Sequence, residues 1–309
     1  MNWKLKSAIQ RACGALPWGS DGIYYGIQRV FGRLREPEPP LAMLSEAANL
    51  ARWLQDAGVP VTGKRILEVG TGRRVDLPFG LFLAGAGPIY TCDRHPYLRL
   101  SLVSRSVKYM CAHRAEIAAG FLPFVEAGLF HSRLESLCRA DPQRLLGIAQ
   151  IRYAAPADAA SVPLGDGSID VHLSYTVLEH IPPRALAGIL NEARRLLSPG
   201  GVALHHIDPS DHFSHIDSSI SAINFLQFSE QQWRRHAGNR FAYHNRLRSS
   251  HYRALFENCG YEILRCEETV DRRSLELLRS GFPLDPQFRS MPPEVLCCSV
   301  LRVLARPRV

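Results

Sequence analysis

The stretch Ile66-Leu67-Glu68-Val69-Gly70-Thr71-Gly72 decides the fold. Residues 65–69 form a short apolar run of the kind that becomes a buried strand. The glycines that follow let the backbone turn tightly and approach a ligand without a Cβ in the way. Open α/β sheets bind ligands where such loops leave the carboxyl ends of strands. The stretch therefore predicts the first strand of an α/β sheet and a ligand-binding loop behind it.

Strands and helices alternate along the rest of the chain. Helices are expected at residues 41–57, 77–86, 95–112, 183–197 and 249–259, with extra helices inserted at 113–150. Further strands are expected at 88–92, 151–155, 169–175, 202–207, 261–270 and 295–305, and a turn at 198–201. This alternation predicts a doubly wound, mainly parallel seven-stranded sheet with helices on both faces.

The chain of 309 residues, 46% of them hydrophobic, can bury one large core. We assign residues 1–40 to a helical N-terminal extension and 41–309 to the main domain, with a cap-like insertion at about 209–248. The extension could cover an active site, lie on a membrane or pack on the core. Its aromatic residues are Trp3, Trp18, Tyr24, Tyr25 and Phe31.

Charge and cysteine content limit the partners and the compartment. The net charge is +8, but no run of five Lys or Arg residues predicts a nucleic-acid partner. None of the eight cysteines forms a C-x-x-C pair, so we expect reduced thiols and a cytoplasmic protein. No apolar stretch approaches the roughly 20 residues of a membrane-spanning helix. The basic N-terminal segment leaves a peripheral membrane contact open, and nothing in the sequence indicates an oligomeric state.

Three further blocks follow the glycine loop. They are Ala157-Asp158-Ala159 with Ser161 to Asp170 behind it, Val177-Leu178-Glu179-His180, and Arg195-Leu196-Leu197-Ser198-Pro199-Gly200-Gly201. In this order, over about residues 62–208, the blocks resemble the class I S-adenosylmethionine-dependent methyltransferases, especially the small-molecule and glycan subgroup with LEH and PGG blocks. The resemblance implies a Rossmann-like methyltransferase sheet and S-adenosylmethionine as the cofactor.

The resemblance also implies roles for the loop after the first strand. Glu68, Gly70 and Gly72 would form the side of the site that holds the amino-acid part of the cofactor. One residue departs from the family pattern, because Arg74 stands where a third glycine is usual. Its side chain must therefore point away from the cofactor or contact it.

Acidic residues at the ends of the next strands complete the expected cofactor site. Asp93 ends the second strand, where a carboxylate can accept hydrogen bonds from both ribose hydroxyls. By the resemblance, Asp158 would accept a hydrogen bond from the adenine amino group, with Ala159 packing nearby. Ser174, at the end of the fourth strand, would face the methionine part of the cofactor.

Histidines and aspartates cluster after the fourth and fifth strands, where the acceptor is expected. Histidine suits a general base because its ordinary pKa lies near neutrality. We predict His206 or His212 as the base, oriented by Asp208 or Asp211, with His180 as the reserve. His205 cannot face the same side as His206, since successive strand residues point to opposite faces. The four histidines and three aspartates of residues 205–217 could also hold a divalent cation, but their spacing matches no standard metal motif, so no metal ligands are assigned.

The predicted reaction is O-methylation of a sugar, glycan precursor or other small-molecule hydroxyl. A lipid or quinone acceptor is the alternative, and a non-catalytic binding protein that keeps the fold is another. A nicotinamide oxidoreductase is disfavoured because the loop lacks G-x-G-x-x-G. The aromatic, amide and arginine side chains of residues 224–248 suit either a sugar-binding surface or a packed cap.

Overall fold

The seven expected strands form one sheet, in the order β3-β2-β1-β4-β5-β7-β6. The structure is a computed structural model that describes residues 1–15, 22–23, 26 and 39–308. Strands β1 to β5 pair in parallel, and β7 runs antiparallel to both of its neighbours. The mainly parallel seven-stranded prediction is therefore confirmed. The strands are β1 (Ile66–Val69), β2 (Ile89–Cys92), β3 (Ile151–Ala154), β4 (Ile169–Tyr175), β5 (Leu197–Ile207), β6 (Tyr261–Val270) and β7 (Cys298–Pro307).

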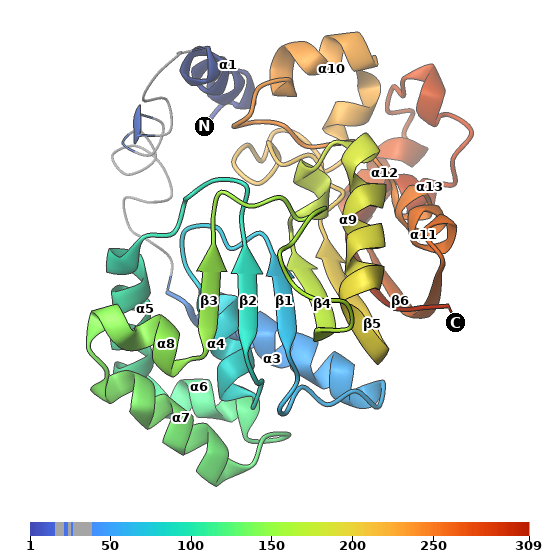
Figure 1. The fold of residues 1–309 in the computed structure, drawn as a ribbon. Coiled ribbons are helices and arrows are strands. Elements are labelled where there is room, and N and C mark those ends of the chain that lie inside the picture. Colours follow the sequence, from blue (N-terminus) through green and yellow to red (C-terminus); the bar gives the residue numbers. More distant parts are fainter. Residues whose placement is uncertain (16–21, 24–25, 27–38, 309) are drawn as a thin grey trace.

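Helices cover both faces of the sheet (Figure 1). The helices whose side chains join the first core cluster are α3 (Leu41–Asp56), α4 (Asp76–Leu83), α5 (Leu100–Ala112), α6 (Arg114–Phe121), α7 (Ala127–Arg139) and α8 (Leu145–Ile148), with η1 (Pro142–Arg144) between the last two. On the other face lie α9 (Pro183–Leu196) and α11 (Ser249–Asn258). Their side chains join a second core cluster with residues of β6 and β7 and with the β1 side chains that point to this face. Because parallel strands are buried on both sides, their core residues are near-continuous apolar runs.

Two expected boundaries near β5 and α5 were wrong, and the last strand, expected from residue 295, begins at Cys298 because residues 293–296 form a helix. Residues 198–201, expected as a turn, lie within β5, where Leu197 pairs with Ile169 and a register shift precedes the regular pairing from Val202. Residues 95–99, expected as helix, precede α5. Pro96 explains the second difference, because the residue before a proline is disfavoured in the α-helical region.

The insertion between β2 and β3 contains the expected extra helices and one covalent link. Cys111 of α5 and Cys138 of α7 form a disulfide across 27 residues of chain. The expectation that all eight cysteines are reduced is therefore wrong for this pair. The spacing between the two cysteines carried no signal for it, since the helices that bring them together meet only in the tertiary fold.

A third core cluster forms the cap over the carboxyl ends of the parallel strands (Figure 1). Its elements are α1 (Trp3–Gly14), η3 (Asn224–Gln227), α10 (Glu230–Ala237), α12 (Arg272–Arg279), η4 (Pro286–Phe288) and α13 (Pro293–Leu296). The cap is larger than the predicted insertion at 209–248, because the N-terminal helix and residues 272–296 also contribute to it.

Helix α1 packs on the cap through its buried face. The Trp3 ring lies 5.6 Å from the Phe213 ring, and the Ser7 hydroxyl donates to the carbonyl of His236 over 2.8 Å. Of the three alternatives for the N-terminal segment, packing is therefore the one that α1 adopts. Trp18, Tyr24, Tyr25 and Phe31 lie outside the described residues. No helix in the described part of the chain combines the length and apolar character that crossing a bilayer requires.

Four of the ten aromatic and arginine side chains expected as a sugar-binding surface are buried in the cap, whereas those of Arg234, Arg235 and Arg240 are exposed. Phe225 and Arg248 are fully buried, and Trp233 and Arg246 nearly so. Arg248 donates to the carbonyls of Pro209, Arg246 and Leu296. These contacts favour the packed-cap alternative for residues 224–248.

Candidate functional site

The loop after β1 rests on a buried carboxylate. Glu68 is only 3% exposed and accepts a hydrogen bond from the hydroxyl of Thr91 on β2. The Thr91 hydroxyl also lies 2.6 Å from that of Thr71 in the loop. Burial raises the pKa of Glu68 to about 8. Glu68 therefore lies beneath the loop, where it ties β1 to β2, rather than on an open surface.

Gly70 and Gly72 of this loop differ in the space around their Cα atoms. Both have positive φ, +93° at Gly70 and +66° at Gly72, a region that L-residues rarely adopt. A Cβ on Gly70 would lie 2.3 Å from a methyl carbon of Val177. A Cβ on Gly72 would have no atom of the described residues within 4 Å. Gly70 thus permits close packing against the segment after β4, whereas Gly72 borders open space.

Asp93 connects the loops after β1, β2 and β3. Its carboxylate accepts hydrogen bonds from the backbone N–H of Gly72 over 2.9 Å and of His95 over 3.0 Å. Its carbonyl accepts from the N–H of Ala157 over 2.9 Å. The carboxylate is therefore held in one orientation, with lone pairs left to accept further donors.

Asp158 and Ala159 follow the segment held by Asp93. The Asp158 side chain is exposed and accepts a hydrogen bond from the N–H of Ala160 over 2.9 Å. Ala159 is half-buried against the core cluster on the α9 face. A carboxylate in this position remains open to a donor from solvent or ligand.

One buried thiol shows that the three carboxylates converge. Burial raises the pKa of Cys92 to about 12, and the charges of Glu68, Asp93 and Asp158 raise it in the same direction. Glu68 on β1, Asp93 after β2 and Asp158 after β3 therefore all lie near the end of β2. Glu68 is buried there, whereas Asp158 is exposed and Asp93 is held beside the loop that contains Gly72.

Ser174 does not offer a free hydroxyl. Its side chain is fully buried and lies 2.8 Å from Nδ1 of His205, on the face that Phe256 covers. The hydroxyl is therefore engaged with His205, and the place of Ser174 beside the methionine part of the cofactor stays a prediction.

Thr176, two residues after Ser174, has an unusual backbone conformation, with φ +51°. Such a conformation in a β-branched residue is rare and concentrates at functional sites.

Arg74 turns to the start of α4. Its Nε lies 2.9 Å from a carboxylate oxygen of Asp76, which is 2% exposed. Burial raises the pKa of Asp76, and the positive charge of Arg74 opposes that change. The residue that replaces the usual third glycine therefore compensates a buried acid.

Four histidine rings gather beyond the ends of β4 and β5. The ring of His212 lies 4.8 Å from that of His180, 5.2 Å from His215 and 4.8 Å from His244. Asp208 reaches two of them, with a carboxylate oxygen 3.5 Å from Nε2 of His212 and 3.3 Å from Nε2 of His215. Burial lowers the pKa of His212 to about 4, so the ring is neutral at pH 7. His244, which the sequence reading did not single out, joins this group from the cap.

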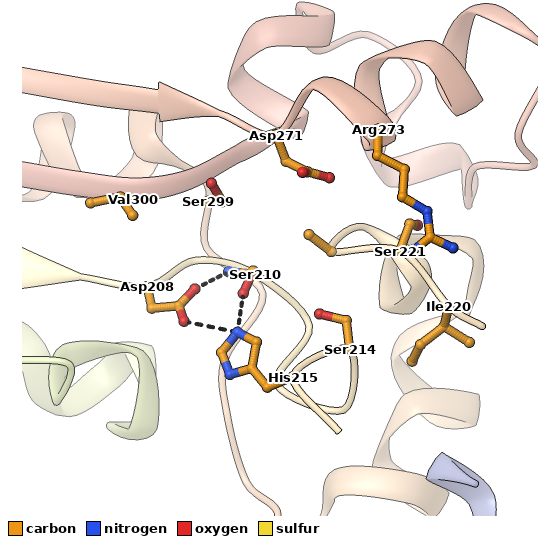
Figure 2. A pocket seen from close by; sticks show the side chains of 11 residues that line it. Asp208, Ser210, Ser214, His215, Ile220, Ser221, Asp271, Arg273, Ser299 and Val300 are labelled. Carbon is orange, nitrogen blue, oxygen red and sulfur yellow. Dashed lines mark hydrogen bonds and ion pairs between the residues drawn. The ribbon is translucent and has the colours of Figure 1, made fainter. Parts of the chain in front are cut away.

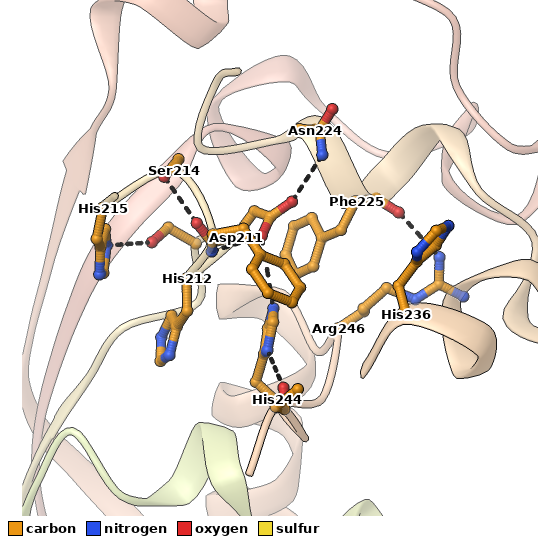
Figure 3. A network of polar contacts seen from close by, with 12 residues as sticks. Asp211, His212, Ser214, His215, Asn224, Phe225, His236, His244 and Arg246 are labelled. Atoms are coloured by element: carbon orange, nitrogen blue, oxygen red, sulfur yellow. Dashed lines mark hydrogen bonds and ion pairs between the residues drawn. The ribbon is translucent and has the colours of Figure 1, made fainter. Parts of the chain in front are cut away.

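Asp211 belongs to the cap interior rather than to His212. Its carboxylate accepts hydrogen bonds from the Asn224 side chain and from the N–H of Phe213, each over 2.9 Å (Figure 3). Its nearest histidine is His244, at 3.8 Å. Burial raises the pKa of Asp211 to about 6. Of the two aspartates predicted to orient the base, the structure brings only Asp208 to His212.

His206 lies on the opposite face of the sheet from His205, as the alternation predicts. Its ring stacks on Tyr175 with centroids 4.3 Å apart, and its Nδ1 accepts a hydrogen bond from Arg302 over 3.1 Å. Burial and the charge of Arg302 lower the pKa of His206 to about 4. Because one nitrogen accepts from Arg302, a neutral ring carries its hydrogen on the other. The lone pair that a general base needs is therefore already in use.

A polar cavity of about 360 Å³ opens next to the histidines (Figure 2). It shares Asp208 and His215 with the histidine group, and Asp271 and Arg273 face it from the start of α12. Its remaining polar lining consists of the hydroxyl groups of Ser210, Ser214, Ser221 and Ser299. A molecule in this cavity would meet these hydrogen-bonding groups together with the apolar side chains of Ile220, Ala222 and Val300.

Part of the chain matches a known domain. Residues 135–205 match the family model described as a methyltransferase domain. The matched range runs from α7 through β3, β4 and α9 into β5, and so contains Asp158, the LEH block and the PGG block. A search of curated protein sequences finds no significant match.

Solved structures of similar fold carry little further information. A sarcosine dimethylglycine methyltransferase described as putative, from Galdieria sulphuraria, is 18% identical, with 85% of each chain covered and a TM-score of 0.45. An S-adenosylmethionine-dependent methyltransferase from Mesorhizobium loti is 18% identical over 85% of this chain and 99% of its own, with a TM-score of 0.43. Likeness at this level says nothing of the acceptor.

Three observations converge on the activity of this protein. The sheet has β7 inserted antiparallel between β5 and β6, Asp93 links the loops after β1, β2 and β3, and the matched domain covers β3, β4 and part of β5. The chain is therefore an enzyme with the class I methyltransferase fold that uses S-adenosylmethionine as its methyl donor.

Proposed function

We propose that this enzyme methylates a hydroxyl group of a small polar acceptor, such as a sugar or glycan precursor. The observation that supports it is the cavity beside the histidine group, with its four serine hydroxyls, Asp271 and Arg273 (Figure 2). A hydroxylated acceptor can exchange hydrogen bonds with all of these groups. A lipid or quinone tail would instead desolvate Asp271 and Arg273 without replacing their hydrogen bonds, which is costly.

The cofactor-binding roles are part of the same proposal. Asp93 would accept hydrogen bonds from the ribose hydroxyls and Asp158 from the adenine amino group, while Gly70 and Gly72 shape the loop beside the amino-acid part. The bound cofactor supplies an electrophilic methyl group. The chain's task is then to hold the acceptor oxygen in line, roughly 3–3.5 Å from the methyl carbon, and to exclude water.

The hydroxyl proton needs a place to go. His212 is neutral, is stacked between His215 and His244, and has Asp208 within reach to orient it. We therefore favour His212 over His206 as the group that activates the hydroxyl, with His180 beside it. Proton removal by a positioned side chain contributes about 10²- to 10⁴-fold to such reactions.

An acceptor screen tests the proposal. Purified enzyme is incubated with methyl-labelled S-adenosylmethionine and matched sets of sugars, sugar nucleotides, quinols and lipids, and the products are analysed by mass spectrometry. We expect label in an ether linkage on a sugar-type acceptor. Label only on amine, quinol or lipid acceptors would refute the proposal.

Asp93→Ala is expected to weaken S-adenosylmethionine binding about 10- to 100-fold. The substitution removes a charged acceptor, and hydrogen bonds to charged groups contribute roughly 1.5–3 kcal/mol. It also leaves the N–H groups of Gly72 and His95 without their partner. Isothermal titration calorimetry measures the change, with the exposed Asp141→Ala as the matched control. Equal affinities of the two variants would refute the ribose role.

Alanine substitutions at the two glycines should separate stability from binding. Gly70→Ala places a Cβ 2.3 Å from Val177, so we expect the free energy of unfolding to fall by about 2–3 kcal/mol. Gly72→Ala meets no described atom, so we expect a loss near 1 kcal/mol from its positive φ together with weaker cofactor binding. Urea denaturation and calorimetry on both variants check this. Equal destabilisation by both would contradict the different packing of the two positions.

A further inference from the structure

Three side chains with metal-ligating atoms meet beside the proposed acceptor cavity. One ligand atom each from Glu179, His180 and His212 lies within 4.8 Å of the other two. Glu179 and His180 come from the η2 turn (Leu178–His180) after β4, and His212 from the loop after β5. Two imidazoles and one carboxylate form a ligand set common in protein sites for divalent transition metals.

The Glu179 carboxylate is the strongest sign that something is bound here. The residue is 1% exposed, and neither carboxylate oxygen makes a hydrogen bond of good geometry with the described residues, although the backbone N–H groups of Glu179 and Asp208 approach it. Burying a carboxylate without a partner is costly, and buried polar groups in proteins are nearly always satisfied. A cation among these three side chains would supply the missing partner.

His180 already has the orientation of a metal ligand. Its Nδ1 lies 2.9 Å from the carbonyl oxygen of Tyr243, which can only accept, so Nδ1 carries the hydrogen. Nε2 is then left with its lone pair. Metal-binding histidines characteristically donate their other N–H to a carbonyl or carboxylate in this way, which fixes the tautomer and the ring.

Asn245 holds the turn that carries Glu179 and His180. Its side-chain amide donates to the carbonyls of Leu178 over 3.0 Å and Ile181 over 2.9 Å, and its backbone N–H donates to the carbonyl of Glu179 over 2.7 Å. Tyr252 in turn donates to the amide oxygen of Asn245 over 3.0 Å. The two ligand residues are therefore positioned by a network outside the ligand set itself.

The spacing of the three ligands is within reach of an ion. Ligand atoms about 2.1 Å from a tetrahedral ion lie about 3.4 Å apart, so the three atoms must draw together by up to about 1.4 Å. Because the Tyr243 carbonyl holds the His180 ring, the adjustment falls mainly to the His212 ring, whose side chain is 21% exposed. Nitrogen ligands favour zinc, manganese or iron over magnesium and calcium, which prefer oxygen.

We propose that Glu179, His180 and His212 bind a divalent first-row transition-metal ion, which holds the acceptor hydroxyl and makes it more acidic. The second half of this statement rests on the proposed O-methylation. A hydroxyl bound to such an ion loses its proton more easily. As the oxygen–methyl bond forms, the bond from that methyl carbon to sulfur breaks and sulfur keeps the electron pair, giving a neutral thioether. The hydroxyl proton leaves to Asp208 or to solvent.

Metal binding is tested on the full chain with the ions alone. Protein treated with a chelator is titrated with Zn²⁺ and Mn²⁺ by calorimetry, with Mg²⁺ for comparison, and with Co²⁺ for its visible absorption. We expect one site per chain for Zn²⁺, at least tenfold weaker binding in Glu179→Gln and His212→Ala, and unchanged binding in His131→Ala, an exposed histidine on α7. Circular dichroism and S-adenosylmethionine affinity show whether each variant is folded.

The outcomes separate the metal site from the proposed reaction. Absence of a stoichiometric site, or equal binding by Glu179→Gln and the wild type, would overturn the metal proposal while leaving O-methylation intact. If the chelator-treated enzyme transfers methyl groups to a hydroxyl at the rate of the metal-loaded enzyme, the ion has only a structural role. That result would overturn the proposal that the ion acidifies the acceptor hydroxyl. If the protein binds the metal ion but the acceptor screen gives no ether product, either with or without the ion, the result would instead count against the proposed function.

Discussion

His212→Ala lowers kcat by about 10²- to 10⁴-fold, the range for removal of a group that assists proton transfer, while the Kd for S-adenosylmethionine changes by less than about twofold. The large effect is expected because His212 lies in the histidine group beside Asp208, where a neutral ring can take the hydroxyl proton. In the further inference the same lone pair binds the metal ion instead, and the substitution then removes a ligand of the ion that makes the hydroxyl acidic. The small effect is expected because Asp93 and Asp158, which we propose to bind the cofactor, lie on the loops after β2 and β3 rather than in the histidine group. Steady-state kinetics and calorimetry on the same preparation measure both.

Two comparison variants make that result interpretable. His131→Ala removes an exposed histidine of α7 and should leave kcat within about twofold of the wild type. His206→Ala tests the other base that the sequence predicts. A large loss of kcat in His206→Ala with full activity in His212→Ala would assign proton transfer to His206 and would show that its contact with Arg302 breaks during the reaction.

Arg248→Ala is expected to lower the free energy of unfolding by about 3–5 kcal/mol. Arg248 is fully buried, and its guanidinium lies 5.0 Å from the centre of the Phe225 ring. Burial lowers its pKa to about 10, so it stays charged at pH 7. Its loss opens a cavity and leaves the carbonyls of Pro209, Arg246 and Leu296 without this donor, and each unsatisfied buried group costs about 1–3 kcal/mol.

Urea denaturation followed by circular dichroism measures the loss of stability. The matched control is Arg253→Ala, on the adjoining helix α11, whose side chain is 52% exposed and lies 3.5 Å from Glu268. Exposed ion pairs contribute little, so we expect a change below about 1 kcal/mol. Similar small changes in both variants would mean that the cap does not depend on Arg248.

The fold could be predicted largely from local pattern, because β1, β2 and β4 are short, largely apolar runs that alternate with helical segments. The differences arise where distant segments meet. Leu197 enters β5 early because Ile169 of β4 lies beside it, and the apolar pattern of either segment alone does not contain that pairing. Cys111 and Cys138 are in contact only because α5 and α7 pack together.

The candidate site could be predicted where a motif prescribes backbone geometry. The positive φ angles of Gly70 and Gly72 and the position of Asp93 are of this kind. Side-chain direction could not be predicted in the same way. Ser174 points to His205 because neighbouring β5 offers a buried partner, and His244 reaches the histidine group through the folding of the cap.

The contact of Asn245 with the turn after β4 bears on how freely this enzyme could change its acceptor in evolution. A cap that makes no contact with the catalytic residues could be replaced without changing their positions. Here the cap supplies the amide that holds the carbonyls of Leu178 and Ile181, between which Glu179 and His180 lie. A recombinant that receives a foreign cap would inherit new specificity only if the donor segment brings an equivalent amide, so the two parts must diverge together.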